Sequence, residues 1–86
     1  MKYTVIIPKS VEKEILSLPN VVIRKVIKEF EKLQGVPRPA GCKKLKGEQG
    51  WRVRIGEYRI LYDIDDKKKQ IVIRKVSHRK DVYRSN

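Results

Sequence analysis

Three arginines in a predicted β-hairpin, Arg52, Arg54 and Arg59, are the residues of this chain best suited to chemistry. Residues 51–62 alternate apolar and polar side chains around Gly56-Glu57, which is typical of two antiparallel strands joined by a two-residue turn. In this register Arg54 faces Arg59, and Arg52 lies on the same face of the sheet. Like charges directly opposite each other cost up to about 1 kcal/mol. The pattern therefore favours a polyanion bound across this face, and phosphate is the simplest candidate.

The other face of the hairpin is predicted to be apolar and to pack on the core. Glycine at the first central position of the turn sets the pairing of the two strands. It pairs Ile55 with Tyr58, Val53 with Ile60 and Arg52 with Leu61. The apolar face then consists of Trp51, Val53, Ile55, Tyr58, Ile60 and Tyr62.

Length and charge narrow the class of protein. A chain of 86 residues makes one domain, residues 1–86, with a small core. It carries 22 Lys and Arg against 10 Asp and Glu, a net charge of +12. Most of the excess lies from Lys43 onward, where 14 basic residues oppose 6 acidic ones. This balance favours nucleic acid or an acidic protein as the partner, although a merely well-solvated surface is the alternative.

Several kinds of site are not predicted. Cys42 and His78 stand alone, so neither an intrachain disulfide nor an ordinary Cys/His zinc site is expected, and a reducing cytosol is the natural compartment. We find no signal-peptide pattern and no apolar run of the roughly 20 residues needed to span a bilayer. Paired carboxylates, a glycine-rich phosphate loop and a Ser/His/Asp set are also missing from the sequence. No metal or cofactor is therefore expected.

The remaining elements predict a small α+β sandwich. Residues 2–7 indicate a strand, and Val11, Ile15, Leu16 and Leu18 a short helix that begins after Pro8 and ends before Pro19. Asn20 is the expected N-cap of a second helix that ends at Gly35, with a core stripe of Val22, Val26, Ile27, Phe30 and Leu33. Residues 65–69 read as a solvated turn and residues 70–76 as a strand. The order β-αα-β-β-β describes two layers, with a mostly antiparallel sheet, the helical hairpin on one face and the arginines on the uncovered face.

The C-terminal segment supplies groups that could move protons. Ser77 is the expected N-cap of a short terminal helix, with Arg79 and Tyr83 on one face and His78 on the next. Arginines, lysines, one histidine and one tyrosine suit transesterification of RNA by its own 2′-hydroxyl. This reaction needs alignment and charge neutralisation from the protein more than covalent chemistry. His78 and Tyr83 are both candidates for the base or acid, and both have a purely structural alternative.

At these residues the chain resembles the RelE-type toxins of bacterial and archaeal toxin-antitoxin pairs. The resemblance rests on four segments in order: residues 44–47, 51–54, 56–62 and 77–83. It implies the compact fold described above and a ribosome-dependent mRNA endonuclease that cuts the codon in the A site, leaving a 2′,3′-cyclic phosphate. It also implies an acidic antitoxin, partly disordered when free, that covers the basic face or displaces the terminal helix.

The resemblance also implies roles for individual residues. Arg52 and Arg54 stand where well-studied members carry two lysines, and arginine stays protonated, so we limit both to phosphate binding. Arg59 matches a clamp on the phosphoryl oxygens, Arg79 a group that stabilises the leaving 5′-oxygen, and Tyr83 or His78 the base. The RNA backbone would be held by Lys43, Lys44 and Lys46.

Three other functions fit parts of the same pattern. ParE-type toxins share the fold and poison DNA gyrase without cutting RNA. A catalytically silent module that binds RNA or the ribosome would keep the basic residues and be indifferent to Tyr83. The third is a DNA-binding protein, for which the sequence offers no helix rich in Arg, Asn or Gln for base recognition.

Overall fold

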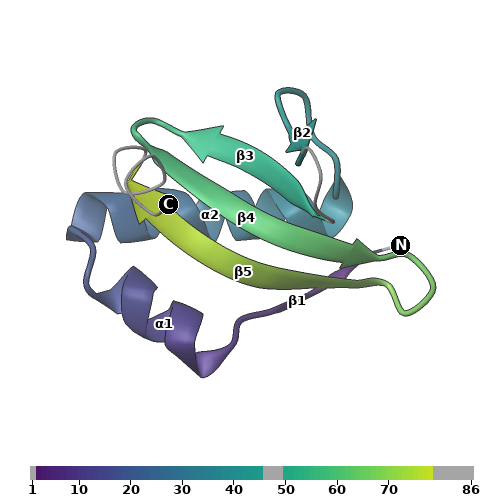
Figure 1. The fold of residues 1–86 in the computed structure, drawn as a ribbon, viewed down its shortest axis with the longest axis horizontal. Helices are drawn as coiled ribbons and strands as arrows, with labels where there is room; N and C mark the ends of the chain where they lie inside the picture. The colour runs from purple at the N-terminus through teal and green to yellow at the C-terminus, as the bar shows by residue number, and fades with distance from the viewer. Residues whose placement is uncertain (1, 46–49, 79–86) are drawn as a thin grey trace.

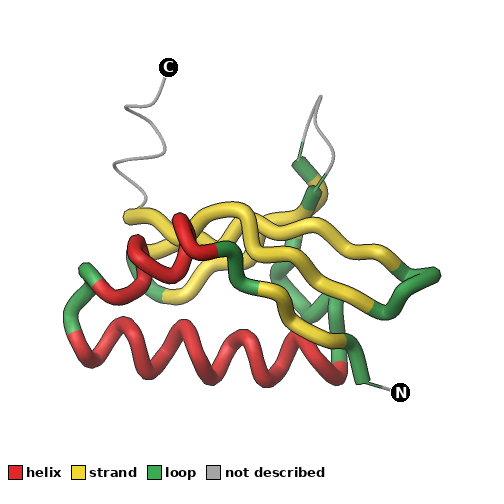
Figure 2. Tube along the Cα trace, turned by 90° about the horizontal axis from the view of Figure 1, so that it is seen from below, coloured by secondary structure: helices red, strands yellow, loops and turns green. Residues whose placement is uncertain are grey.

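The structure, a computed structural model, describes residues 2–45 and 50–78. Two layers make up the fold, a five-stranded sheet and a pair of helices (Figure 1). Figure 2 shows α2 running beneath one face of the sheet. The predicted α+β sandwich is confirmed. Its elements are β1 (Thr4–Ile6), α1 (Lys9–Leu16), α2 (Asn20–Gly35), β2 (Lys43–Lys44), β3 (Trp51–Ile55), β4 (Tyr58–Asp65) and β5 (Gln70–His78).

The strand order is β1-β5-β4-β3-β2. Every neighbouring pair is antiparallel except β1 and β5, which run parallel with Val5 opposite Ile71. The strand β2 was not predicted, because two residues are too few to show an alternating pattern. It adds a short edge in which Lys43 pairs with Arg52 and Lys44 with Trp51.

The β3–β4 hairpin has the predicted register. Ile55 pairs with Tyr58 and Arg54 with Arg59, as the two-residue turn requires. Gly56 has φ +61°, whereas Glu57 is not among the residues with positive φ. This combination is that of a type II′ turn, whose twist matches the twist of the strands it joins. The turn therefore aligns the arginines.

The core lies between the helices and one face of the sheet. Helix residues such as Val26 and Leu33 pack on buried strand residues such as Ile60 and Tyr62, all of them fully buried. Ile27, which we expected in this stripe, is 49% exposed because it follows Val26 by about 100° around the helix. The buried hydrophobic residues are Val11, Ile15, Val26, Phe30, Leu33, Val53, Ile60, Tyr62, Ile71, Ile73 and Val76.

Two predicted caps are wrong. Asn20 is the first residue of α2, and Pro19, with extended backbone, occupies the N-cap position. Ser77 caps no helix because β5 continues through His78 and pairs Ser77 with Arg59. The apolar residues that indicated this strand end at Val76, so the sequence placed its end two residues early. No helix in the described ranges is long and apolar enough to cross a membrane.

Candidate nucleic-acid interface

The three hairpin arginines lie on the sheet face opposite the helices, as predicted, but they differ in exposure. Arg54 is exposed and Arg52 is partly buried. Arg59 is only 5% exposed, which contradicts the expectation of an uncovered group of three. Its position on a central strand, between β3 and β5, explains part of this burial. Arg59 is therefore held in place by its surroundings, while Arg54 is open to solvent.

The register of the sheet brings further lysines to this face. One row runs from Lys43 through Arg52 and Leu61 to Lys75, across β2, β3, β4 and β5. At about 4.8 Å per strand the row is about 14 Å long. A second row contains Arg54, Arg59 and Ser77. We call the five cations of these rows the basic face: Lys43, Arg52, Arg54, Arg59 and Lys75.

Sequence reasoning did not assign Lys75, and a β-bulge next to it makes the facing of the residues in β5 hard to read from the sequence. Leu61 pairs with Lys75 but Tyr62 pairs with Ile73, so Arg74 is an extra residue in β5. Simple alternation back from Val76 would assign Lys75 correctly but would place Ile73 on the wrong face. Ile73 is fully buried against the helices. The bulge makes the face of each residue depend on the pairing with β4, which the sequence alone does not reveal.

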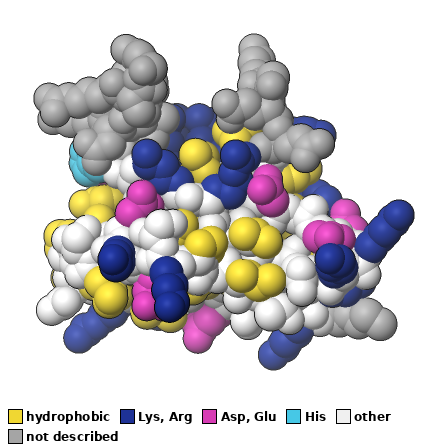
Figure 3. Space-filling model, turned by 60° about the horizontal axis from the view of Figure 1, so that its bottom comes forward, with side chains coloured by type: hydrophobic (Ala, Val, Ile, Leu, Met, Phe, Trp, Pro, Cys, Tyr) yellow, Lys and Arg dark blue, Asp and Glu magenta, His cyan; other side chains and the backbone are white. Residues whose placement is uncertain are grey.

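Acidic residues border the basic face at its far end. The Nε atom of Arg74 lies 3.7 Å from Oδ2 of Asp63. Gly50 packs closely on this pair, because a Cβ atom added there would lie 3.0 Å from Oδ1 of Asp63. Its φ of +121° also favours glycine. Figure 3 shows dark blue Lys and Arg side chains spread over this side of the molecule, with magenta acidic side chains among them.

His78 is not brought to the arginines. It pairs with Tyr58, and the two rings make an edge-to-face contact at 5.1 Å between centroids. Because neighbouring residues of a strand point to opposite faces, His78 points away from the face that carries Arg59 and Ser77. Its ring lines a pocket of about 360 Å³ beside α1, which Glu14 and Leu18 also line.

Helix α1 covers the edge of β5 next to this pocket. Oε1 of Glu14 accepts a hydrogen bond of 3.2 Å from the backbone N–H of Val76. Figure 1 shows α1 lying alongside β5, at the margin of the sheet. Val76 lies beyond the residues of β5 that pair with β1, so the carboxylate satisfies a backbone donor that has no strand beside it, and this part of β5 is less open to pairing with another chain. His78 thus belongs to a structural region of the fold.

Lys44 takes part in a second cluster, centred on Trp51. Its Nζ atom lies 5.9 Å from the centroid of the Trp51 ring, and the guanidinium carbon of Arg38 lies 5.1 Å from it. Arg38 is anchored in turn by Asp66, at 2.9 Å and 3.4 Å between side-chain nitrogens and oxygens. The Tyr3 hydroxyl donates to the same carboxylate at 2.6 Å. We call these five residues the Trp51 cluster.

Electrostatics in the Trp51 cluster follow from these contacts. The hydrogen bond from Arg38, followed by that from Tyr3, holds the pKa of Asp66 below its usual value. The same bond raises the pKa of Arg38. The sequence indicated only a solvated turn at residues 65–69. No local pattern shows that Asp66 in this turn contacts Tyr3 and Arg38, which lie far away in the sequence.

A nearby tyrosine links the sheet to the same loop. The Tyr62 hydroxyl donates a 2.9 Å hydrogen bond to the backbone oxygen of Pro37, next to Arg38. Burial, with a smaller effect of Cys42, raises the pKa of the Tyr62 phenol, so it stays protonated and keeps donating. This bond helps to hold the loop that carries Arg38 over the sheet.

Comparison with known proteins places the chain in a family. A family model described as the ParE toxin of the type II toxin-antitoxin system parDE matches residues 5–83. The chain is 36% identical to the putative toxin RelE1 of Methanocaldococcus jannaschii, covering 99% of both chains. It is also 36% identical to toxin RelG of Mycobacterium tuberculosis, covering 98% of this chain and 99% of that one. The chain belongs to the RelE/ParE superfamily of type II toxins.

Solved structures agree with a RelE-type toxin. The crystal structure of the archaeal RelE-RelB complex from Pyrococcus horikoshii matches with a TM-score of 0.83 and 34% identity, covering 92% of this chain and 97% of that one. The RelBE2 toxin-antitoxin complex from Mycobacterium tuberculosis matches with a TM-score of 0.81 and 31% identity, covering 91% and 92%. Both likenesses extend over nearly the whole chain.

Some predicted site residues of this RelE-type toxin lie outside the described ranges. These are Lys46, Arg79 and Tyr83. Within residues 2–45 and 50–78, no group of three or more His, Cys, Asp and Glu residues is placed to hold a metal ion. Of the predicted RNA-binding lysines in those ranges, Lys43 lies in the basic face and Lys44 in the Trp51 cluster. The described part of the site is therefore a cationic surface.

Proposed function

We propose that this RelE-type toxin inhibits translation as a ribosome-dependent mRNA endonuclease that cuts codons in the A site. The observation that carries the proposal is the basic face, whose five cations come from four adjacent strands. Repulsion among them is a cost to the fold that a bound phosphodiester would relieve. The names of the RelE1 and RelG relatives support the same class of toxin.

The chemistry would be attack of the substrate's own 2′-hydroxyl on the adjacent phosphorus. The P–O5′ bond breaks, and the products are a 2′,3′-cyclic phosphate and a 5′-hydroxyl. Negative charge grows on the phosphoryl oxygens, where fixed guanidinium groups are most effective because they need no reorganisation. Buried Arg59 suits this clamping role, and Arg52 and exposed Arg54 suit binding of the flanking backbone.

Lys75 adds a cation that sequence reasoning had not assigned. It flanks Leu61 on the side opposite Arg52 and lies diagonally from Arg59. Such diagonal neighbours have Cα atoms about 7–8 Å apart, so two long side chains can reach one phosphate. We propose that Lys75 binds the RNA backbone together with Arg59.

Proton transfer is proposed for Tyr83, with Arg79 at the leaving 5′-oxygen, on the strength of the resemblance alone. His78 was the other candidate for the base, and it points to the opposite face from the arginines. We therefore propose that His78 takes no part in proton transfer.

An antitoxin is the proposed protein partner. The RelE chains from Pyrococcus horikoshii and Mycobacterium tuberculosis were both solved in toxin-antitoxin complexes. A net charge of +12 favours an acidic partner, since complementary charge steers association and suppresses wrong partners. Masking of the basic face by that partner would keep the toxin from RNA.

The deciding experiment is cleavage on programmed ribosomes, with mRNA ends mapped by primer extension. Charge-assisted hydrogen bonds are worth about 1.5–3 kcal/mol, so Arg52→Gln and Arg54→Gln should each slow cleavage by about 10- to 150-fold. Lys67→Gln, in the exposed β4–β5 turn, removes the same charge away from the site and should cut at the wild-type rate. His78→Gln should retain the wild-type pH profile.

The outcomes separate the candidate functions. Intact message with all variants, together with trapped gyrase-DNA complexes, would assign the chain to the ParE type, which the description of the matching family model keeps open. Ribosome binding without cleavage would indicate a silent binding module. Loss of cleavage in His78→Gln with a changed pH profile would restore His78 as the base.

A further inference from the structure

We propose that Trp51 and the pocket beside it form a nucleobase-binding site, in which a base of single-stranded RNA stacks on the indole ring. The proposal rests on RNA being a ligand of this toxin, as proposed above. It concerns a site separate from the basic face. It assigns a use to the Trp51 cluster, which the proposed cleavage chemistry leaves without one.

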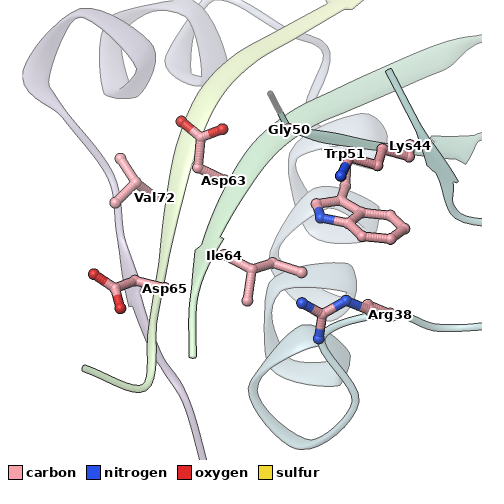
Figure 4. A pocket seen from close by; sticks show the side chains of 8 residues that line it. All are labelled: Arg38, Lys44, Gly50, Trp51, Asp63, Ile64, Asp65 and Val72. Atoms are coloured by element: carbon pink, nitrogen blue, oxygen red, sulfur yellow. The ribbon is translucent and has the colours of Figure 1, made fainter. Parts of the chain in front are cut away.

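The pocket is large enough for a nucleotide. Its volume is about 480 Å³, within the range of about 300–1,000 Å³ that is usual for small-molecule sites. The pocket lies at the end of β4 that extends beyond β3. Trp51, the first residue of β3, pairs with Tyr62, and residues 63–65 of β4 have no partner in β3. Figure 4 shows the indole ring with Ile64 and Arg38 on the same side of the strands. Its lining residues are Arg38, Lys44, Gly50, Trp51, Asp63, Ile64, Asp65 and Val72.

The two cations beside the ring are held very differently. Arg38 is fixed by its two hydrogen bonds to Asp66, which also accepts from Tyr3. Lys44 is exposed, and its ammonium lies 5.9 Å from the ring centroid, near the outer limit of a cation–π contact. Arg38 therefore supports the ring while Lys44 is free to move aside.

Stacking of a nucleobase on the Trp51 ring is stronger than the contact of Lys44 with that ring, which favours exchange of Lys44 for the base. An exposed cation–π contact strengthens binding by about 2- to 5-fold, whereas stacking of a nucleobase on an aromatic side chain is worth about 5- to 150-fold. Displaced from the ring, the Lys44 ammonium can pair with a phosphate of the same nucleotide. The exchange thus replaces a weak contact with a stronger one.

Charge in the pocket selects a base rather than a phosphate. Asp63 and Asp65 line it, and both carboxylates are already engaged, Asp63 with Arg74 and Asp65 with the backbone N–H of Lys68. The two carboxylates lie on the other side of β4 from Ile64 and the indole ring (Figure 4), so their charge disfavours phosphate along that border of the pocket. A nucleotide fits this distribution of charge when its neutral base enters the pocket and its phosphate stays outside, near Lys44.

The chain provides its own probe, because Trp51 is its single tryptophan. The test uses a 2′-O-methyl RNA hexanucleotide, which lacks the attacking hydroxyl and cannot be cleaved, without ribosomes. Indole fluorescence should be quenched at saturation. Inorganic tripolyphosphate and an abasic ribose-phosphate oligomer of the same length should leave it nearly unchanged. Equal quenching by all three, or none by the hexanucleotide, would overturn the proposal.

Two variants give an independent readout by anisotropy of a labelled hexanucleotide. Trp51→Tyr keeps an aromatic ring and should bind within a few-fold of wild type, whereas Trp51→Leu should bind about 5- to 150-fold more weakly. Circular dichroism checks that both variants fold, and equal affinity of the two folded variants contradicts stacking. The hexanucleotide experiment does not depend on cleavage, so quenching in a protein that cuts no message would sustain this site while the proposed endonuclease failed.

Discussion

The repulsion between Arg54 and Arg59 should be measurable as a gain in stability when it is removed. The two residues are directly opposite in β3 and β4, on the face away from the helices. At the dielectric constant of water, which gives the smallest value for a pair that includes buried Arg59, two unit charges about 6 Å apart repel by about 0.7 kcal/mol. Screening with a Debye length of about 30 Å at 0.01 M salt leaves about 0.6 kcal/mol, and one of about 3 Å at 1 M leaves about 0.1 kcal/mol.

This energy converts to a shift in melting temperature. For a domain of this size, 1 kcal/mol corresponds to about 4–8 °C. Arg54→Gln should therefore raise Tm by about 2–5 °C at 0.01 M salt and by less than about 1 °C at 1 M. The same substitution should slow mRNA cleavage. If Arg54 binds phosphate and also destabilises the fold, its removal should raise Tm and lower the cleavage rate together.

The assay is thermal unfolding followed by circular dichroism at the two salt concentrations. Arg54→Lys keeps the charge and should show no gain, and Lys67→Gln corrects for the general benefit of lowering a net charge of +12. The reasoning fails if Arg54→Gln melts no higher than Lys67→Gln at low salt. It fails equally if the gain persists undiminished at 1 M.

Two further predictions concern the loop that carries Arg38. Tyr62→Phe removes the hydrogen bond to Pro37 and should cost about 0.5–1.5 kcal/mol, or about 2–12 °C in Tm; an unchanged Tm would show that the bond contributes nothing net. The pKa of Asp66 is lowered in the folded state, so its contribution is complete above the unfolded value of about 3.9 and is lost as the pH falls through the folded value. Chemical denaturation between pH 6 and pH 2 should therefore show a steeper loss of stability in wild type than in Asp66→Asn, and parallel curves would contradict this.

Local pattern was sufficient for the hairpin and the helices. Gly56, with positive φ, and Glu57, with negative φ, form a tight turn. Strict alternation of apolar and polar residues in both strands then leaves a single register that buries the apolar residues. Prolines at 8 and 19 mark the beginnings of α1 and α2 for a similar reason, since their φ is fixed and they lack an N–H. The misplaced details are the cap at Asn20 and the facing of Ile27 and of Leu16, which is 67% exposed.

The candidate site was only half predictable. Arg52, Arg54 and Arg59 share a face by alternation alone, and Lys43 joins them through an edge strand too short to be seen in the sequence. Alternation back from Val76 places Lys75 on the same face, but the bulge at Leu61 and Tyr62 breaks the alternation between Lys75 and Ile73. The burial of Arg59 depends in part on the strands on either side of it. The pairing of Lys43 with Arg52 and the burial of Arg59 do not follow from spacing along the chain.

The sequence by itself determined the two-layer fold, the strand pairing of the hairpin and the family, because these depend on short-range periodicity and on ordered local motifs. Only the tertiary structure decided which charges meet. It turned His78 to the face opposite the arginines, brought Lys75 to theirs and joined Tyr3, Arg38 and Asp66 into one cluster around Trp51. Contacts of that kind are set by strand order, by a one-residue bulge and by loops that close over many residues, and each of these is a property of the packed chain.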